Sequence, residues 1–286
     1  MNTDKENQGV PKIIWIYWAQ GWDKAPHLVQ QCRKSWEHYN PDWDIRCLDQ
    51  KTVTKYFDIK TWMPGPPLSG PQWLVSLKER LHALLHSTHL IKQKKVKIQH
   101  RADIIRVNLL NQYGGVWSDA TLWCHRPLND WINAHTTEGF FAFSNPGHLL
   151  NDKSYSLFSS YFLASHKNSY IIKILSKSVQ KYWEDHERDD EYFWINTLFN
   201  YSYNHDTVFR NSWDNTLKID APVSSDHGPE YFAWYTEKEL SGISKGFIDM
   251  INSRDTPAFK LTNRKKDPID KYDKIQYLFD TTRKTS

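Results

Sequence analysis

Long apolar runs and cysteines are both scarce in this sequence of 286 residues. No stretch of about 18 consecutive apolar residues occurs, so we expect no membrane-spanning helix. The first residues, MNTDKENQGV, contain no apolar segment of the kind that directs secretion. The three cysteines, Cys32, Cys47 and Cys124, are odd in number and widely spaced, which fits neither a disulfide framework nor a zinc finger. We therefore expect reduced, buried cysteines and a cytoplasmic protein.

Net charge is small as well, at +4 for the whole chain, and does not indicate a nucleic-acid partner. The basic residues are nevertheless unevenly spread, and two clusters stand out. These clusters are Lys92, Lys94, Lys95 and Lys97, and Arg264, Lys265 and Lys266. A solvated surface is the simpler interpretation. Contact with phosphate groups, or with anionic lipid headgroups at a membrane surface, is the alternative.

Glycine-rich phosphate loops are absent: the sequence contains neither G-x-G-x-x-G nor G-x-x-x-x-G-K-[ST]. Aromatic residues, by contrast, are abundant, with 14 Trp, 15 Tyr and 13 Phe. Most of them should fill the core, because aromatic side chains bury large areas there. The surplus of tryptophan also suits sugar binding, since the flat apolar face of a pyranose stacks on an indole ring.

The N-terminal part predicts a strand, a helix and a second strand. Residues 12–18, KIIWIYW, are almost wholly apolar, which is typical of a strand buried on both faces of a parallel sheet. A helix should begin near Pro26 and end at Asn40, and residues 44–48 should form the next strand. Such a unit is expected to be parallel and right-handed.

The remaining pattern predicts one α/β domain over residues 1–286, with a mixed, Rossmann-like sheet flanked by helices. Residues from about 51 to 97 look like an inserted helical segment, interrupted by a stretch rich in proline and glycine. From about 204 to 286 the chain looks loop-rich with short strands. The other expected elements are a helix ending at Tyr113, strands over 116–118, 140–143 and 155–163, and helices over 168–183 and 192–203.

Three charged residues stand where a ligand would be bound in such a fold. Asp103 and Arg106 lie three positions apart on the predicted helix and so project from one face. Asp119 follows the Gly114-Gly115 break and ends the next strand, and ligands of open α/β sheets bind outside the carboxyl ends of strands. We therefore expect all three side chains to meet at one sheet edge. A carboxylate there could hold Mg²⁺ or Mn²⁺, which neutralises a diphosphate.

The segment that carries these residues, ADIIRVNLLNQYGGVWSDAT (102–121), resembles glycosyltransferase family 32, a group of sugar transferases with a DXD motif. It is most similar to the capsular polysaccharide synthesis branch, whose pattern is roughly SD-x-x-R, a helix, then GG-x-[YW]-x-D-A-[ST]. Residues 11–48 add to the resemblance, and the large clostridial glucosylating toxins share the same spacing.

The resemblance implies a GT-A fold, Mn²⁺ or Mg²⁺, and a hexose-type sugar moved from a UDP-sugar with retained configuration. It also implies a saccharide or lipid-linked saccharide acceptor in surface polysaccharide synthesis. A lipid-linked acceptor would bring the protein to the inner face of the membrane as a peripheral protein.

Catalytic roles fall, on this resemblance, to Asp103, Arg106 and Asp119, with Asp119 as the metal ligand. The implied donor contacts are Tyr17, Trp18, Asp103, Arg106, Trp117, Ser118, Asp119 and Thr121. Thr121 fits the [ST] of the branch pattern but departs from the family's longer motif, which has a second acidic residue two positions after the first. A hydroxyl is a weaker metal ligand than a carboxylate. Further metal ligands are sought in the C-terminal part, at Asp226, His227 and the stretch Lys260-Leu261-Thr262-Asn263, above all at Thr262 and Asn263.

Plainer interpretations stay open for several residues. Asp103 and Arg106 could form an ordinary ion pair, and Glu191 could be a solvated residue at a helix start instead of an acceptor contact. Surface histidines explain His82, His86 and His89 better than a zinc site does. The alternative functions are a metal-dependent nucleotidyl- or phosphoryl-transfer enzyme and a carbohydrate-binding protein without catalysis.

Overall fold

The computed structural model describes residues 9–57, 96–145, 156–186, 191–222, 226–233, 236–262 and 269–282. Most of the predicted insertion, with its helix and its three histidines, lies outside these residues. So do most of the two basic clusters, and Asn263. Within the described ranges, no helix combines the length and the apolar character that crossing a bilayer demands.

The centre of the fold is a mixed five-stranded sheet in the order β2-β1-β3-β6-β5. Its strands are β1 (Ile13–Tyr17), β2 (Asp44–Leu48), β3 (Gly115–Asp119), β5 (Phe140–Ser144) and β6 (Phe158–Ser165). β2 and β3 both run parallel to β1, whereas β6 is antiparallel to β3 and to β5. The predicted mixed sheet flanked by helices is therefore confirmed.

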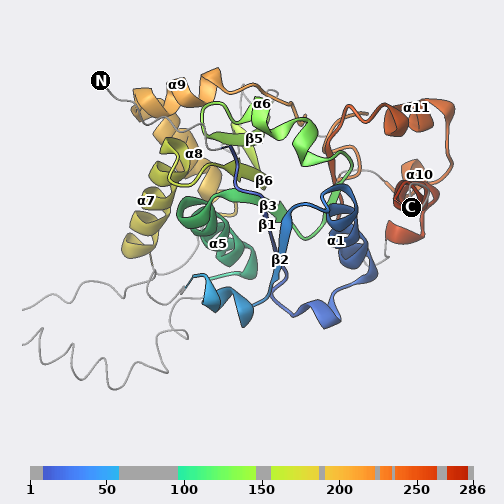
Figure 1. Cartoon of the computed structure of the whole chain (residues 1–286), viewed down its shortest axis with the longest axis horizontal. Helices are drawn as coiled ribbons and strands as arrows, with labels where there is room; N and C mark the ends of the chain where they lie inside the picture. The colour runs from blue at the N-terminus through green and yellow to red at the C-terminus, as the bar shows by residue number, and fades with distance from the viewer. Residues whose placement is uncertain are drawn as a thin grey trace, which may run out of the picture.

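Helices cover both faces of this sheet (Figure 1). The longer ones are α1 (His27–Tyr39), α5 (Ile98–Tyr113), α7 (Tyr170–Asp185), α8 (Trp194–His205) and α9 (Thr207–Asn215). The shorter ones are α6 (Ile132–His135) and the 3-10 helices Trp22–Lys24, Thr52–Lys55 and Leu128–Asp130. α5, α7, α8 and α9 pack on one face of the sheet, and α1 and α6 pack on the other.

Burial on both faces explains the nearly continuous apolar sequence of β1. Trp15 and Tyr17 point into the core formed with α5 and α7, whereas Ile14 and Ile16 point into the core formed with α1. Strands β1 and β3 pair in register, with Tyr17 opposite Asp119. The carboxyl ends of these two strands therefore lie side by side.

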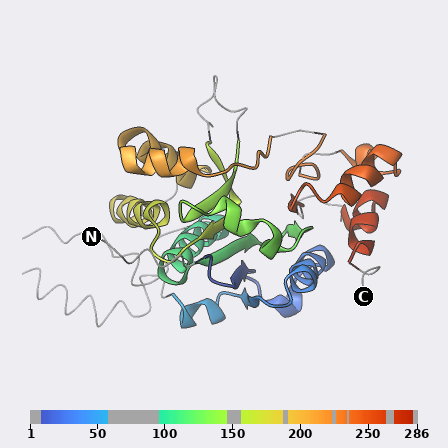
Figure 2. The same ribbon diagram turned by 45° about the horizontal axis from the view of Figure 1, so that its top comes forward.

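The C-terminal part differs from the loop-rich stretch with short strands that the sequence predicted. It contains the strand β7 (Ala258–Lys260), which pairs antiparallel with β4 (Leu122–Cys124). It also contains helices α10 (Glu237–Leu240), α11 (Lys245–Ser253) and α12 (Asp273–Asp280), and the 3-10 helix Ile269–Lys271. These helices are short, and they are stabilised by a shared apolar cluster with α1 that includes Leu28 and Cys32. In both views they lie at the opposite end of the molecule from α7, α8 and α9 (Figure 1, Figure 2).

Two glycines make the tight turn from α5 into β3. Gly114 and Gly115 have φ angles of +70° and +95°, which favour glycine over other residues. A Cβ atom on Gly115 would lie 2.5 Å from the carbonyl oxygen of Ile13 on the neighbouring strand. The turn therefore brings the chain back along the sheet directly under the helix that it has just left.

Candidate functional site

Asp103, Arg106 and Asp119 meet at one edge of the sheet, as their sequence positions predicted. Nη2 of Arg106 lies 3.2 Å from Oδ1 of Asp103 and 3.3 Å from Oδ1 of Asp119. One guanidinium group thus bridges two carboxylates that are separated in the chain by a helix, a turn and a strand. The spatial arrangement is observed, and the catalytic roles of the three residues stay a prediction.

Arg106 is held rigidly between the helix and the sheet. Its guanidinium carbon lies 5.1 Å above the centre of the Trp117 ring, on the β3 face that α5 covers. Its Nη1 donates a hydrogen bond to the carbonyl oxygen of Ser160 on β6. The side chain is 6% exposed, so its position is set by packing and not by solvent. A fixed, buried guanidinium of this kind offers a preorganised positive charge.

Asp103 is a buried acid whose charge is poorly compensated. Burial raises the pKa of its carboxyl group to about 6, and the opposing attraction of Arg106 only partly offsets this. The indole Nε1 of Trp194 on α8 donates a hydrogen bond to Oδ2 at 3.0 Å. Asp103 therefore changes its protonation state close to neutral pH, which is a frequent property of functional sites.

Asp119 behaves in the opposite way. Burial by itself raises its pKa, but Lys260 and Arg106 together outweigh burial, so the pKa lies below its usual value. Oδ1 accepts a hydrogen bond from Nε1 of Trp117 at 3.1 Å, and Oδ2 lies 2.7 Å from Nζ of Lys260. Asp119 is therefore ionised at neutral pH, and each of its oxygens already has a donor.

Lys260 belongs to a stretch that the sequence marked only for possible metal ligands, and its role as a cation beside Asp119 was not predicted. Its Nζ also donates to Oγ1 of Thr121 at 3.0 Å, and it lies 5.4 Å from the centre of the Tyr161 ring. Lys260 reaches the site because β7 pairs with β4, with Lys260 opposite Leu122. Such a contact spans 139 residues, and no local sequence pattern could have indicated it.

The predicted donor-contact residues divide between the two faces of the sheet. Tyr17 and Trp117 are buried in the core under α5, on the same face as Asp119. Trp18 is half-buried and packs against the other core. Ser118 is fully buried and donates to the carbonyl oxygen of Asp119, so its side chain lies on the opposite face from the carboxylate. Tyr17 and Trp117 thus lie in the core next to the site, and Ser118 faces away from it.

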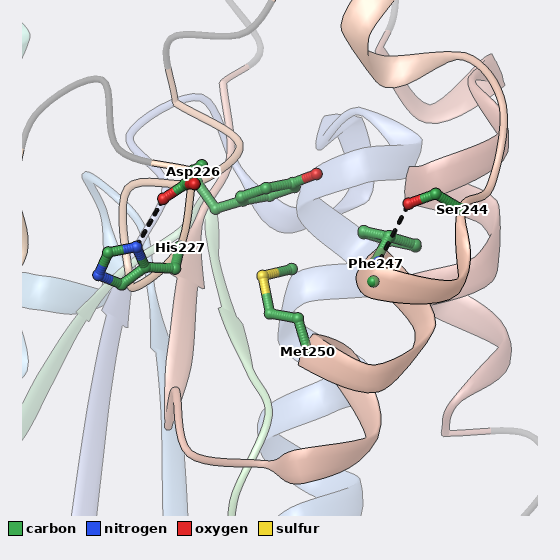
Figure 3. A pocket seen from close by; sticks show the side chains of 7 residues that line it. Asp226, His227, Ser244, Phe247 and Met250 are labelled. Atoms are coloured by element: carbon green, nitrogen blue, oxygen red, sulfur yellow. Dashed lines mark hydrogen bonds and ion pairs between the residues drawn. The ribbon is translucent and has the colours of Figure 1, made fainter.

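Glu191 and the predicted C-terminal ligands lie at more exposed positions. Glu191 accepts a hydrogen bond from Thr197 and fits the simpler interpretation of a solvated residue. Asp226 and His227 contact each other at 2.7 Å on an exposed turn. They line one side of a pocket of about 400 Å³, and α11 lines the other side with Phe247 and Met250 (Figure 3).

The residues around Asp119 do not fit a divalent metal ion. Mg²⁺ and Mn²⁺ prefer several oxygen ligands with carboxylates among them. The part of the chain that the structure describes contains no cluster of three or more histidine, cysteine or acidic side chains suited to a metal. Oδ2 of Asp119 also accepts a hydrogen bond from the ammonium group of Lys260. A metal there would have to displace a cation.

Curated relatives and solved structures are similar to parts of this chain. The O-glycosyltransferase braB of Annulohypoxylon truncatum is 24% identical over 197 residues, and the glycosyltransferase afumC of Aspergillus fumigatus is 27% identical over 128 residues. These matches cover 60% and 44% of this chain, which spans only 38% and 28% of the relatives.

Among solved structures, the PaToxG glycosyltransferase matches with a TM-score of 0.42 and 14% identity, covering 72% of this chain and 75% of that one. The catalytic domain of alpha-toxin from Clostridium novyi matches with a TM-score of 0.36 and 10% identity, covering 74% and 65%. Neither likeness assigns the fold by itself.

A family model extends the similarity to most of the sequence. The model is described as "Capsular polysaccharide synthesis protein", and it matches residues 1–64 and 86–277. The matched ranges include the strand β1, the helix α5 and both carboxylates of the site, as well as Lys260. On the strength of this match, the chain belongs to the capsular polysaccharide synthesis protein family.

Proposed function

We propose that this protein is a glycosyltransferase of GT-A type that moves a hexose-type sugar from a UDP-sugar to an acceptor. The acceptor we propose is a saccharide or lipid-linked saccharide in surface polysaccharide synthesis. The protein would bind it in the cytoplasm or at the inner face of the membrane. The observation that carries the proposal is the pair of carboxylates, Asp103 and Asp119, bridged by Arg106 beside the carboxyl ends of β1 and β3. Glycosyltransferase names among the relatives support the same reaction class.

The charges at this site suit the departure of a nucleoside diphosphate. When the sugar leaves, the bond between its anomeric carbon and the diphosphate oxygen breaks, and the electron pair stays on that oxygen. The guanidinium of Arg106 and the ammonium of Lys260 offer fixed positive charge for this oxygen. The acceptor hydroxyl oxygen forms the new bond to the anomeric carbon, and its proton passes to the departing phosphate. This route keeps the attack on one face of the sugar and so retains configuration.

Asp103 is suited to hold the donor sugar. Carboxylates bind sugar hydroxyls through charge-assisted hydrogen bonds, which are stronger when little water competes. The Asp103 side chain is 10% exposed, and its carboxylate is oriented by hydrogen bonding to Trp194 and by the ion pair with Arg106. A sugar hydroxyl that donates to this carboxylate would also favour its ionised form.

The proposal is tested by measuring UDP release from a panel of UDP-sugars, with saccharide acceptors present. Asp119→Asn should lower turnover by about 100-fold or more, because it removes the charge that orders Arg106 and Lys260. Asp42→Asn is the matched control, since Asp42 is exposed and its partners among the described residues include the surface residues Lys12 and Asn129. The turnover of this variant should equal that of the wild type.

Turnover that survives Asp119→Asn would contradict the proposal. Binding of saccharides with no turnover of any donor would instead indicate a carbohydrate-binding protein. An anomer-resolved NMR spectrum of the product tests retention separately.

A further inference from the structure

We infer that the ammonium group of Lys260 supplies, together with Arg106, the positive charge that a donor diphosphate needs, so that this site works without a divalent metal. The inference rests on the proposed function and goes beyond it, because the family resemblance implies Mn²⁺ or Mg²⁺. The residues around Asp119 do not match that implied metal, because a lysine ammonium occupies the place beside its carboxylate.

The position of Lys260 is the first observation. Its Nζ lies between Oδ2 of Asp119, at 2.7 Å, and Oγ1 of Thr121, at 3.0 Å. Asp119 and Thr121 stand at the two positions that would bind the metal in a DXD motif. An ammonium group has three N–H donors, and these two contacts occupy two of them. In the proposed complex the third donor would bind a phosphate oxygen.

Charge balance is the second observation. A metal site with two carboxylates and a divalent cation is neutral before the donor arrives. In this protein Thr121 replaces one of the two carboxylates, and Lys260 takes the place of the metal. The negative charge of Asp119 and the positive charge of Lys260 then also sum to zero. A diphosphate therefore meets the same net local charge at the Asp119–Lys260 pair as at a metal site with two carboxylates. Replacement of an acidic residue by threonine weakens a metal site but leaves a lysine site intact, because the hydroxyl still accepts a hydrogen bond from the ammonium.

Accessibility is the third observation. The side chains of Lys260 and Asp119 are 22% and 26% exposed, whereas Arg106 and Asp103 are 6% and 10% exposed. The lysine thus lies at the solvent side of the cluster, where a phosphate can reach it. The aromatic ring of Tyr161 contacts it from the protein side. The ammonium is held in place but is not sealed inside the core.

The experiment measures UDP binding by calorimetry in EDTA and again in Mn²⁺, using the full chain. Wild type should bind UDP in EDTA within about threefold of its affinity in Mn²⁺. Lys260→Met, which keeps the aliphatic stem, should weaken binding in EDTA by about 10- to 100-fold. Lys260→Arg should retain most of the affinity. Lys218→Met is the matched control, because Lys218 is also half-buried and its ammonium lies 4.1 Å from the centre of an aromatic ring, that of Trp213 on α9.

A second variant tests the charge balance through a gain of metal dependence and not through a loss of UDP affinity. In the double variant Lys260→Met with Thr121→Asp, the site gains a second carboxylate and loses the ammonium. This variant should bind UDP in Mn²⁺ at least tenfold more tightly than in EDTA, whereas the wild type should not show that difference. Thermal unfolding of each variant checks that it folds.

Two results would overturn the inference in distinguishable ways. If wild type binds UDP only in Mn²⁺, and Lys260→Met leaves that binding equal or tighter, then Lys260 only fills a metal position and the proposed function stands. If wild type binds neither UDP nor GDP in either condition and turns over no nucleotide sugar, both the inference and the proposed function are wrong.

Discussion

Replacement of Asp103 by asparagine should stabilise the protein at neutral pH while it abolishes function. The carboxyl group is buried, and its pKa is raised from 3.8 to about 6, first by burial and then by the nearby charge of Asp119, against the attraction of Arg106. Asparagine has nearly the same shape and carries no charge. The Asp103→Asn variant therefore keeps the packing of the site and removes the cost of an ionised carboxylate in a buried place.

The pH dependence follows from the two ionisation states. In the unfolded chain Asp103 loses its proton near pH 3.8, and in the folded protein it does so near pH 6. The folded protein therefore binds this proton more tightly. The stability contributed by the proton is fully present below pH 3.8 and is lost as pH rises to about 6. The whole loss amounts to about 3 kcal/mol at pH 7, as an order of magnitude.

The assay is urea unfolding of wild type and Asp103→Asn between pH 4 and pH 8, compared at each pH. The two proteins should be similar in stability near pH 4, and the variant should be more stable by up to about 3 kcal/mol near pH 7. Asp206→Ala is a useful contrast. Asp206 caps α9, and hydrogen bonds from the backbone N–H groups of Phe209 and Val208 lower its pKa. That variant should lose about 1 kcal/mol at neutral pH, with the difference disappearing as pH falls below about 4.

A different result would refute the reasoning. If Asp103→Asn destabilises the protein by several kcal/mol at every pH, then Asp103 and Arg106 form a structural ion pair that the fold depends on. In that case the raised pKa of Asp103 would not be evidence of function. Loss of UDP-sugar turnover in a variant that is more stable than the wild type is the combination expected of a residue retained for function.

Two further predictions concern the residues that support the site. Gly115→Ala should lower the free energy of unfolding by more than about 3 kcal/mol, because φ is +95° and the new Cβ would lie 2.5 Å from the Ile13 carbonyl oxygen. Gly242→Ala should lower it by only about 1 kcal/mol, because φ is +76° there but no atom lies within 4 Å of the new Cβ. Thermal unfolding of both variants measures the difference. Trp194→Phe removes the N–H group that favours ionised Asp103, so the rising limb of the pH–turnover profile should move to higher pH; an unmoved profile would show that Asp103 is not the group that titrates.

The elements that the sequence predicted well are those whose pattern is complete within one segment. The apolar run of β1, the helix that ends at Tyr113 and the strand that ends at Asp119 each carry their own periodicity and their own stop signals. Their adjacency follows from the parallel βαβ rule, which explains why Asp103 and Asp119 could be expected to meet. Strand β6 and helix α8 begin two or three residues later than predicted, since element ends depend on tertiary contacts.

The C-terminal part could not be predicted in this way because its helices are held by residues far away in the chain. α11 and α12 are nine and eight residues long, too short to be stable alone, and they pack in a cluster with Leu28 and Cys32 of α1. The same dependence on distant contacts applies to the site. Lys260 has no motif of its own, and it lies beside Asp119 only because β7 pairs with β4 across the chain. Thr121 marked the local departure from the family pattern, and the compensating cation comes from a strand that only the tertiary structure brings next to it.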